Sequence, residues 1–124
     1  MSAELFCLAL AVYFEARNQP TAGQVAVAQV VMNRVYDARF PNTVCEVVKD
    51  PWQFSFYWDG KSDRPFEQFA WVKAQVVAEG VMAGSGHVEL IGVAHYHANY
   101  VRPRWATHMR IAVEIGDHVF YYEA

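Results

Sequence analysis

The sequence lacks an excess of positive charge. Its 124 residues contain 10 lysines and arginines against 13 aspartates and glutamates, a formal net charge of −3. A domain that binds duplex nucleic acid is expected to show a basic footprint, so no nucleic-acid partner is expected. Charged residues make up 19% of the chain and hydrophobic residues 54%, a composition that excludes disorder. We therefore expect one folded domain over residues 1–124, with a single core.

Long apolar runs and cysteine clusters are also absent. The longest apolar stretch, Leu5–Phe14, is too short to span a bilayer, and the first residues lack the positive region of a signal peptide. The two cysteines, Cys7 and Cys45, do not make a disulfide framework. We interpret them as small hydrophobes inside helices, and a disulfide between them stays open.

Hydrophobic periodicity predicts that helices come first. Apolar residues recur at helical spacing in three segments, residues 3–17, 21–35 and 66–82. The inner face of the last segment includes Phe66 and Phe69. Thr43 followed by Glu46 is a capping-box pattern that predicts a short helix over residues 43–48, and Thr21 with Gln24 repeats that pattern at the start of the second helix.

The last third of the chain has the pattern of strands. Residues 93–97 look extended, and residues 109–115 alternate apolar with polar or small side chains. Gly116-Asp117 then separates this segment from residues 118–122, which predicts a hairpin. Helices followed by a small antiparallel sheet indicate an α+β fold.

Glu15 is the carboxylate with the most suggestive position. It lies on the flank of the first helix's apolar stripe and in its last turn, where the helix dipole disfavours an anion. This position and burial among neighbouring aromatic residues should both raise its pKa, as a general acid requires. The alternative is a solvated glutamate that pairs with Arg17 or Arg34.

Two further segments have polar and aromatic residues in patterns that fit a binding cleft. In residues 52–58, Trp52, Phe54 and Phe56 alternate with Gln53, Ser55 and Tyr57, so the segment suits either a sugar-binding wall or a plug over the core. His95 and His97 flank Tyr96 and would point the same way in a strand. With His108 or His118 they could bind zinc, but imidazoles that form hydrogen bonds in a polar cleft are favoured. The basic stretch of Arg102, Arg104, His108 and Arg110 is interpreted as a solvated surface.

Taken together, these pieces resemble the cell wall hydrolases of the spore-cortex-lytic, SleB-like type. The similarity covers nearly the whole chain in the right order. It is carried by Leu8–Arg17 with its Glu-Ala-Arg element, Gly23–Ala28, Val30–Val35, Phe40–Cys45, Gln53–Ser55, His95–His97, Pro103, Trp105-Ala106 and Ile115–Tyr121.

The resemblance implies a compact lysozyme-like α+β domain that cleaves the glycan strands of peptidoglycan. The essential acid of the family is the glutamate of the Glu-Ala-Arg element, which corresponds to Glu15. Members are described as lytic transglycosylases that leave 1,6-anhydromuramic ends. We expect Glu15 to be catalytic and Gln53, Ser55, Tyr96 and His97 to hold acetamido and hydroxyl groups of the glycan. The protein is expected to be a monomer that needs no metal or other cofactor.

The sequence departs from the family pattern at two places. Asn18 and Gln19 stand where relatives usually have glycine and glutamate, which removes a second carboxylate near Glu15. Trp52 and Trp58 are found where many relatives have cysteines, so a bridge in that loop is absent. A single carboxyl group that acts as acid and then as base fits these changes.

Other functions stay open. A hydrolytic muramidase could use Asp59 as its base, a metal-dependent amidase could use the histidines, and a non-catalytic module would bind glycan without cleaving it. The lack of a signal peptide leaves the location open between a phage or prophage lysin and a trimmed exported enzyme.

Overall fold

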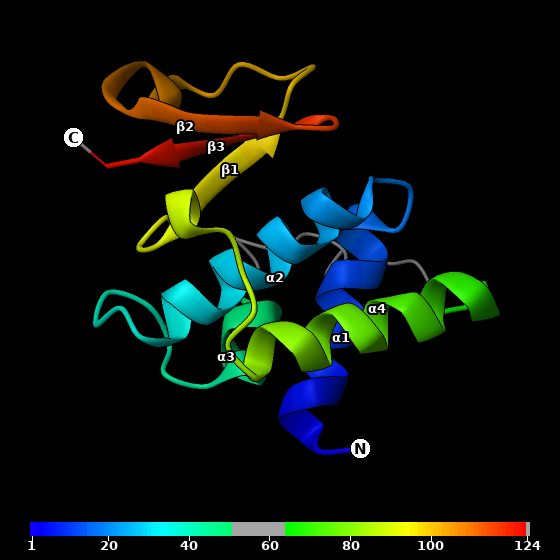
Figure 1. Ribbon diagram of the computed structural model, residues 1–124. Helices are drawn as coiled ribbons and strands as arrows, with labels where there is room; N and C mark the ends of the chain where they lie inside the picture. Colours follow the sequence, from blue (N-terminus) through cyan, green and yellow to red (C-terminus); the bar gives the residue numbers. More distant parts are fainter. Residues whose placement is uncertain (51–63, 124) are drawn as a thin grey trace.

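The computed structural model describes residues 1–50 and 64–123, and it has the predicted order of helices followed by strands. The helices are α1 (Ala3–Ala16), α2 (Thr21–Val35), α3 (Val44–Lys49) and α4 (Gln68–Met82). The short helices η2 (Val88–Leu90) and η3 (Arg104–His108) accompany the strands β1 (His95–Ala98), β2 (Arg110–Ile115) and β3 (His118–Tyr122). The fold is α+β, as predicted (Figure 1). The aromatic segment, with Gln53, Ser55 and Asp59, lies outside the described residues.

Helix α1 is the central helix of the helical layer. Its N-terminus is capped by Ser2, whose Oγ accepts a hydrogen bond from the backbone N–H of Leu5 at 3.1 Å. Every residue from Cys7 to Tyr13 is buried. The sequence predicted one buried apolar stripe on this helix, and the buried surface is wider than that because α2, α3 and α4 all pack against α1.

Helix α2 lies between the other helices and the sheet (Figure 1). Ala28 and Val31 belong to the core formed with α1, α3 and α4. Val27 and Val30 belong to a second core that includes Phe120 of β3. Because α2 is buried on two sides, its inner surface is wider than the single face that periodicity indicated.

The predicted capping box at the start of α2 is wrong. Pro20 occupies the cap position, without a side-chain hydrogen bond, and Gln24 is buried. The Nε2 of Gln24 instead donates to the carbonyl oxygen of Gln19 at 3.3 Å. The buried amide of Gln24 therefore bonds to the segment that follows α1 and does not cap α2.

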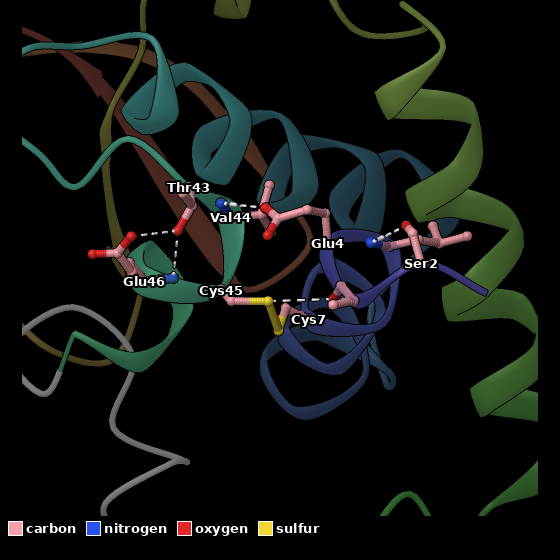
Figure 2. Close-up of a disulfide and its surroundings, with 9 residues drawn as sticks. Ser2, Glu4, Cys7, Thr43, Val44, Cys45 and Glu46 are labelled. Carbon is pink, nitrogen blue, oxygen red and sulfur yellow. Dashed lines mark hydrogen bonds between the residues drawn. A yellow bond between two sulfur atoms is a disulfide. The ribbon is translucent and has the colours of Figure 1, made fainter.

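A disulfide attaches α3 to α1, and a capping residue closes the N-terminus of α3 (Figure 2). The Oγ1 of Thr43 accepts from the N–H of Glu46 at 3.2 Å, which is the cap bond that the pattern predicted. The Glu46 carboxylate accepts from the Thr43 hydroxyl at 2.9 Å, whereas a complete capping box would use the backbone N–H of Thr43. Cys7 and Cys45 form a disulfide across 38 residues of sequence. The interpretation of the two cysteines as separate small hydrophobes is therefore wrong, and the pairing left open is the one observed.

Helix α4 begins later and faces differently than its apolar pattern indicated. Its buried residues are Ala74, Val77, Ala78 and Val81. Phe66 precedes the helix and is 70% exposed, and Phe69 is 95% exposed. Phe69 shares its helix face with Val72 and Val76, which are exposed as well.

The sheet has the strand order β1-β3-β2, and both pairings are antiparallel. The predicted hairpin of β2 and β3 is present, and Gly116 in its turn has a φ of 57°. A register shift between Ile111 and Val113 leaves Ile111 exposed while Ala112 packs on the core, so the predicted alternation fails there. In β1, Tyr96 points toward the helices and stacks on Phe120, whereas His95 and His97 belong to the other face.

No helix among the described residues is both long enough and apolar enough to span a membrane.

Candidate active site

Glu15 lies in the last turn of α1, where two cavities meet. A cavity of about 650 Å³ is lined by Glu15 together with Arg34 of α2, by Tyr96, His97 and other residues of β1, and by residues of the segments that follow β1. Glu15 also lines a smaller cavity of about 270 Å³, whose lining includes Asp117 of the β2–β3 turn. A polymer bound in both cavities would therefore cross the carboxyl group of Glu15.

Tyr96 binds Glu15 directly. Its hydroxyl donates a hydrogen bond to Oε1 of Glu15 at 2.8 Å. Burial, and after it the nearby Glu15 carboxylate, raises the pKa of Tyr96 well above its usual value, so the phenol keeps its proton. Tyr96 therefore orients the carboxyl group through Oε1.

The pKa of Glu15 is raised. Burial is the largest cause, because a partly buried carboxylate loses hydration. The hydrogen bond from Tyr96 and the positive charge of Arg34 act in the opposite direction without cancelling it. The solvated ion pair that was the alternative for Glu15 is not formed with Arg17, whose Nε lies 3.2 Å from Glu67.

Arg34 is a buried cation beside this carboxyl group, and it is only 4% exposed. Its Nε donates to the carbonyl oxygen of Ala94 at 2.9 Å. Burial lowers the pKa of the guanidinium, and the nearby carboxylates of Asp50 and Glu15 act in the opposite direction without cancelling it. The sequence placed Arg34 only as a surface partner of Glu15, although its spacing from Val27 and Val30 puts it on the buried side of α2.

Asn33 and Arg34 together position the strand that carries Tyr96. The Nδ2 of Asn33 donates to the carbonyl oxygens of Leu90 at 2.9 Å and Val93 at 2.7 Å. With the Arg34–Ala94 bond, α2 holds three carbonyls of the segment that enters β1. In the sequence this dipeptide is part of a segment that carries the family resemblance, and no local pattern indicated its role.

His97 lines the larger cavity, but both of its ring nitrogens already have partners. Nδ1 lies 2.7 Å from the carbonyl oxygen of Ala98, and Nε2 lies 2.7 Å from the hydroxyl of Tyr121. A carbonyl can only accept, so Nδ1 carries a hydrogen and neutral His97 accepts from Tyr121 at Nε2. The ring is therefore held as a fixed wall of the cavity.

His118 is a buried histidine that the sequence considered only as a third metal ligand. It is 7% exposed and lines both cavities that Glu15 lines. Its ring centroid lies 5.1 Å from that of Tyr96. Burial lowers the pKa of His118, so at neutral pH the imidazole is uncharged.

A second carboxylate reaches the smaller cavity from the hairpin turn. Asp117 is held by Gln19, whose Nε2 donates to Oδ2 of Asp117 at 3.0 Å and whose Oε1 accepts from the Asp117 N–H at 2.9 Å. A glutamate at position 19 would repel Asp117, so the amide found here suits this arrangement. The sequence considered Asp59 alone for such a role, because Asp117 is close to Glu15 only in the fold.

Within the part of the chain that the structure describes, no group of three or more histidine, cysteine or acidic side chains is placed to hold a metal ion. His95 lies 3.4 Å from Glu123, and His97 has the two partners given above.

Residues 18–121 match the family described as Cell Wall Hydrolase. This chain belongs to that family. The spore cortex-lytic enzymes of Bacillus cereus and Oceanobacillus iheyensis are each 34% identical to it, over 115 and 116 residues. These alignments cover 91% of this chain but 42% and 39% of the relatives, so the chain spans about two fifths of their length.

Two solved structures have the same fold as this cell wall hydrolase. The catalytic domain of SleB from Bacillus anthracis, described as a germination-specific lytic transglycosylase, superposes with a TM-score of 0.82 at 31% identity. That match covers 98% of this chain and 97% of the other. The catalytic domain of Bacillus cereus SleB gives 0.81 at 31% identity, over 96% and 89% of the two chains. The expected family and the α+β fold are thus confirmed.

Proposed function

We propose that this cell wall hydrolase cleaves the glycan strands of peptidoglycan between N-acetylmuramic acid and N-acetylglucosamine, as a lytic transglycosylase. The observation that carries the proposal is the position of Glu15, a carboxyl group of raised pKa at the junction of two cavities. A glycan in both cavities brings one glycosidic bond to this acid. The description of the Bacillus anthracis relative as a lytic transglycosylase supports the same reaction.

In the first step, protonated Glu15 acts as the general acid. Tyr96 occupies Oε1, so the proton is carried on Oε2 and passes to the glycosidic oxygen as the bond from the muramic anomeric carbon breaks. The 2-acetamido group of the muramic residue assists at that carbon. The charge of Arg34 favours the carboxylate that Glu15 becomes.

In the second step, the same carboxylate acts as the base. It takes the proton from the muramic 6-hydroxyl, whose oxygen bonds to the anomeric carbon and closes the 1,6-anhydro ring. The nucleophile is already part of the substrate, so proximity favours this route over attack by water. Glu15 ends the cycle protonated, and no second carboxylate is needed.

Hydrolysis is the second candidate, and Asp117 is the observation that favours it. Asp117 lines the smaller cavity together with Glu15, so a water bound between them would face both carboxyl groups. An inverting glycosidase uses such a pair, one group as acid and the other as base.

Isotope labelling of the product separates the two candidates. Purified peptidoglycan is digested in water enriched in oxygen-18, and the fragments are analysed by mass spectrometry from the earliest time points. We expect unlabelled fragments that are lighter by one water than reducing-end fragments. Reducing muramic ends labelled with oxygen-18 would overturn the transglycosylase and make Asp117→Asn the next variant to measure. Release of free amines without new glycan ends would overturn glycan cleavage altogether.

A further inference from the structure

A third cavity, of about 530 Å³, lies at the outer face of the sheet. It is formed by β-strand residues, among them Tyr121, and by the segment between β1 and η3. Its volume is within the range of ligand pockets, roughly 300–1,000 Å³. Glu15 does not line it, so the reaction described above makes no use of it.

His97 connects this outer cavity to the catalytic one, because it lines both. Its ring is fixed by the Tyr121 hydroxyl at 2.7 Å and the Ala98 carbonyl at 2.7 Å. It also stacks on the Tyr121 ring, with 5.2 Å between centroids, and meets the edge of Trp105 at 5.6 Å. His97 is therefore a fixed side chain at the border of the two cavities.

The outer cavity has charges of both signs. Arg102 supplies a cation, and Glu114 supplies a carboxylate that accepts a hydrogen bond from Nδ2 of Asn99 at 3.1 Å. A neutral sugar gives neither charge a partner of opposite sign. A short peptide with a free carboxylate and a free amine matches both of them.

Peptidoglycan is a branched polymer, and the outer cavity borders the catalytic one at His97. Its glycan strand would lie in the two cavities that share Glu15, and a peptide stem leaves from each muramic residue. Stem peptides have free carboxylates and the amine of a diamino acid. We propose that the outer cavity binds the peptide stem of the muramic residue held beside Glu15, with Arg102 on a stem carboxylate and Glu114 on the amine. This inference rests on the proposed function.

The first test compares glycan chains that keep their stems with the same chains after an amidase has removed them. We expect wild-type kcat/KM to be about tenfold higher on stem-bearing chains, which corresponds to about 1.4 kcal/mol and is within reach of two ion pairs made by exposed side chains. Arg102→Ala should lose this preference and keep its rate on stripped chains. Arg104→Ala, an exposed arginine outside the cavity lining, is the matched control. Equal rates on both substrates, or an equal loss on both in Arg102→Ala, would overturn the proposal.

The second test does not depend on cleavage. Binding of a disaccharide with its tetrapeptide stem and binding of the bare disaccharide are measured by NMR titration with the wild-type protein. We expect the stem to tighten binding about tenfold and Arg102→Ala to abolish the gain. A protein that cleaves neither substrate but shows this gain would have lost the proposed function and kept the stem site. Cleavage without any gain from the stem would leave the function and overturn the stem site.

Discussion

The hydroxyl of Tyr96 lies 2.8 Å from Oε1 of Glu15 and joins the middle of β1 to the last turn of α1. The two residues are 81 positions apart in the sequence. This bond engages Oε1 of the carboxyl group, and in the proposed mechanism the other oxygen, Oε2, carries the proton. It also opposes the effect of burial on the pKa of Glu15, so Tyr96 adjusts both the direction and the acidity of the proposed acid.

Replacement of Glu15 by glutamine should leave the fold intact and remove wall-cleaving activity. We expect a loss of about 10²–10⁴-fold, the usual contribution of a general acid. The release of soluble fragments from purified peptidoglycan measures it. Glu79→Gln, an exposed glutamate of α4, is the matched control and should keep full activity. Substantial activity in folded Glu15→Gln would remove this residue from the mechanism.

Tyr96→Phe should shift the pH profile to higher pH. The Tyr96 hydrogen bond lowers the pKa of Glu15, so its removal raises that pKa further. Activity requires protonated Glu15 and falls as pH rises through its pKa, so the falling limb of kcat/KM should move upward. Tyr122→Phe removes a hydroxyl from β3 that binds the Glu89 carbonyl, and it should leave the limb in place. A shift of the limb to lower pH in Tyr96→Phe would contradict the conclusion that this hydrogen bond lowers the pKa of Glu15.

Glu15→Gln should also stabilise the protein at neutral and higher pH. Burial raises the folded-state pKa of Glu15, so the folded chain holds its proton where the unfolded chain has released it. The contribution of Glu15 to stability is then fully present below the pKa of an unfolded glutamate and is lost as pH rises through the folded value. Melts of wild type and variant over a pH series should agree in acid and diverge above it, with the variant more stable. Equal differences at all pH values would contradict this linkage.

Removal of the disulfide should destabilise the protein without changing its active site. Closure of a loop across 38 residues contributes about 4 kcal/mol in the chain-entropy description. The double variant Cys7→Ser/Cys45→Ser should lose that much unfolding free energy in urea and become insensitive to reductant. Its rate per folded molecule should be retained, because Cys7 lies at the other end of α1 from Glu15. Wild-type melts that do not respond to reductant would contradict a structural role for the bond.

Local signals explain which parts of the fold could be predicted. The Thr43–Glu46 cap and the Gly116 turn depend on residues close in sequence, and both were predicted correctly. Phe69 is the kind of residue that usually lies in a core. However, Ala74 and Val77 pack on the other helices and so determine which face of α4 is buried, and Phe69 lies on the exposed face. Gln24 likewise has the spacing of a cap, and its burial against the end of α1 directs it elsewhere.

In the candidate site, the sequence predicted the acid, Glu15, but not the residues that surround it. Glu15 was identified by its place on one helix and by the resemblance. Its contact with Tyr96, the burial of Arg34 and the approach of Asp117 depend on how α1, α2 and the hairpin turn pack, which periodicity does not specify. Gln53 and Ser55 remain predictions, because they lie outside the described residues.

The three carbonyls that accept hydrogen bonds from Asn33 and Arg34 restrict where the length of the chain can be changed. They fix the chain at Leu90, Val93 and Ala94, so the number of residues from Ala94 to Tyr96 decides which face of the sheet receives the phenol. One inserted or deleted residue there would turn Tyr96 outward and bring a histidine toward Glu15. A change of length in the loop after β1 would leave this register in place, but it would move Arg102 and alter the outer cavity.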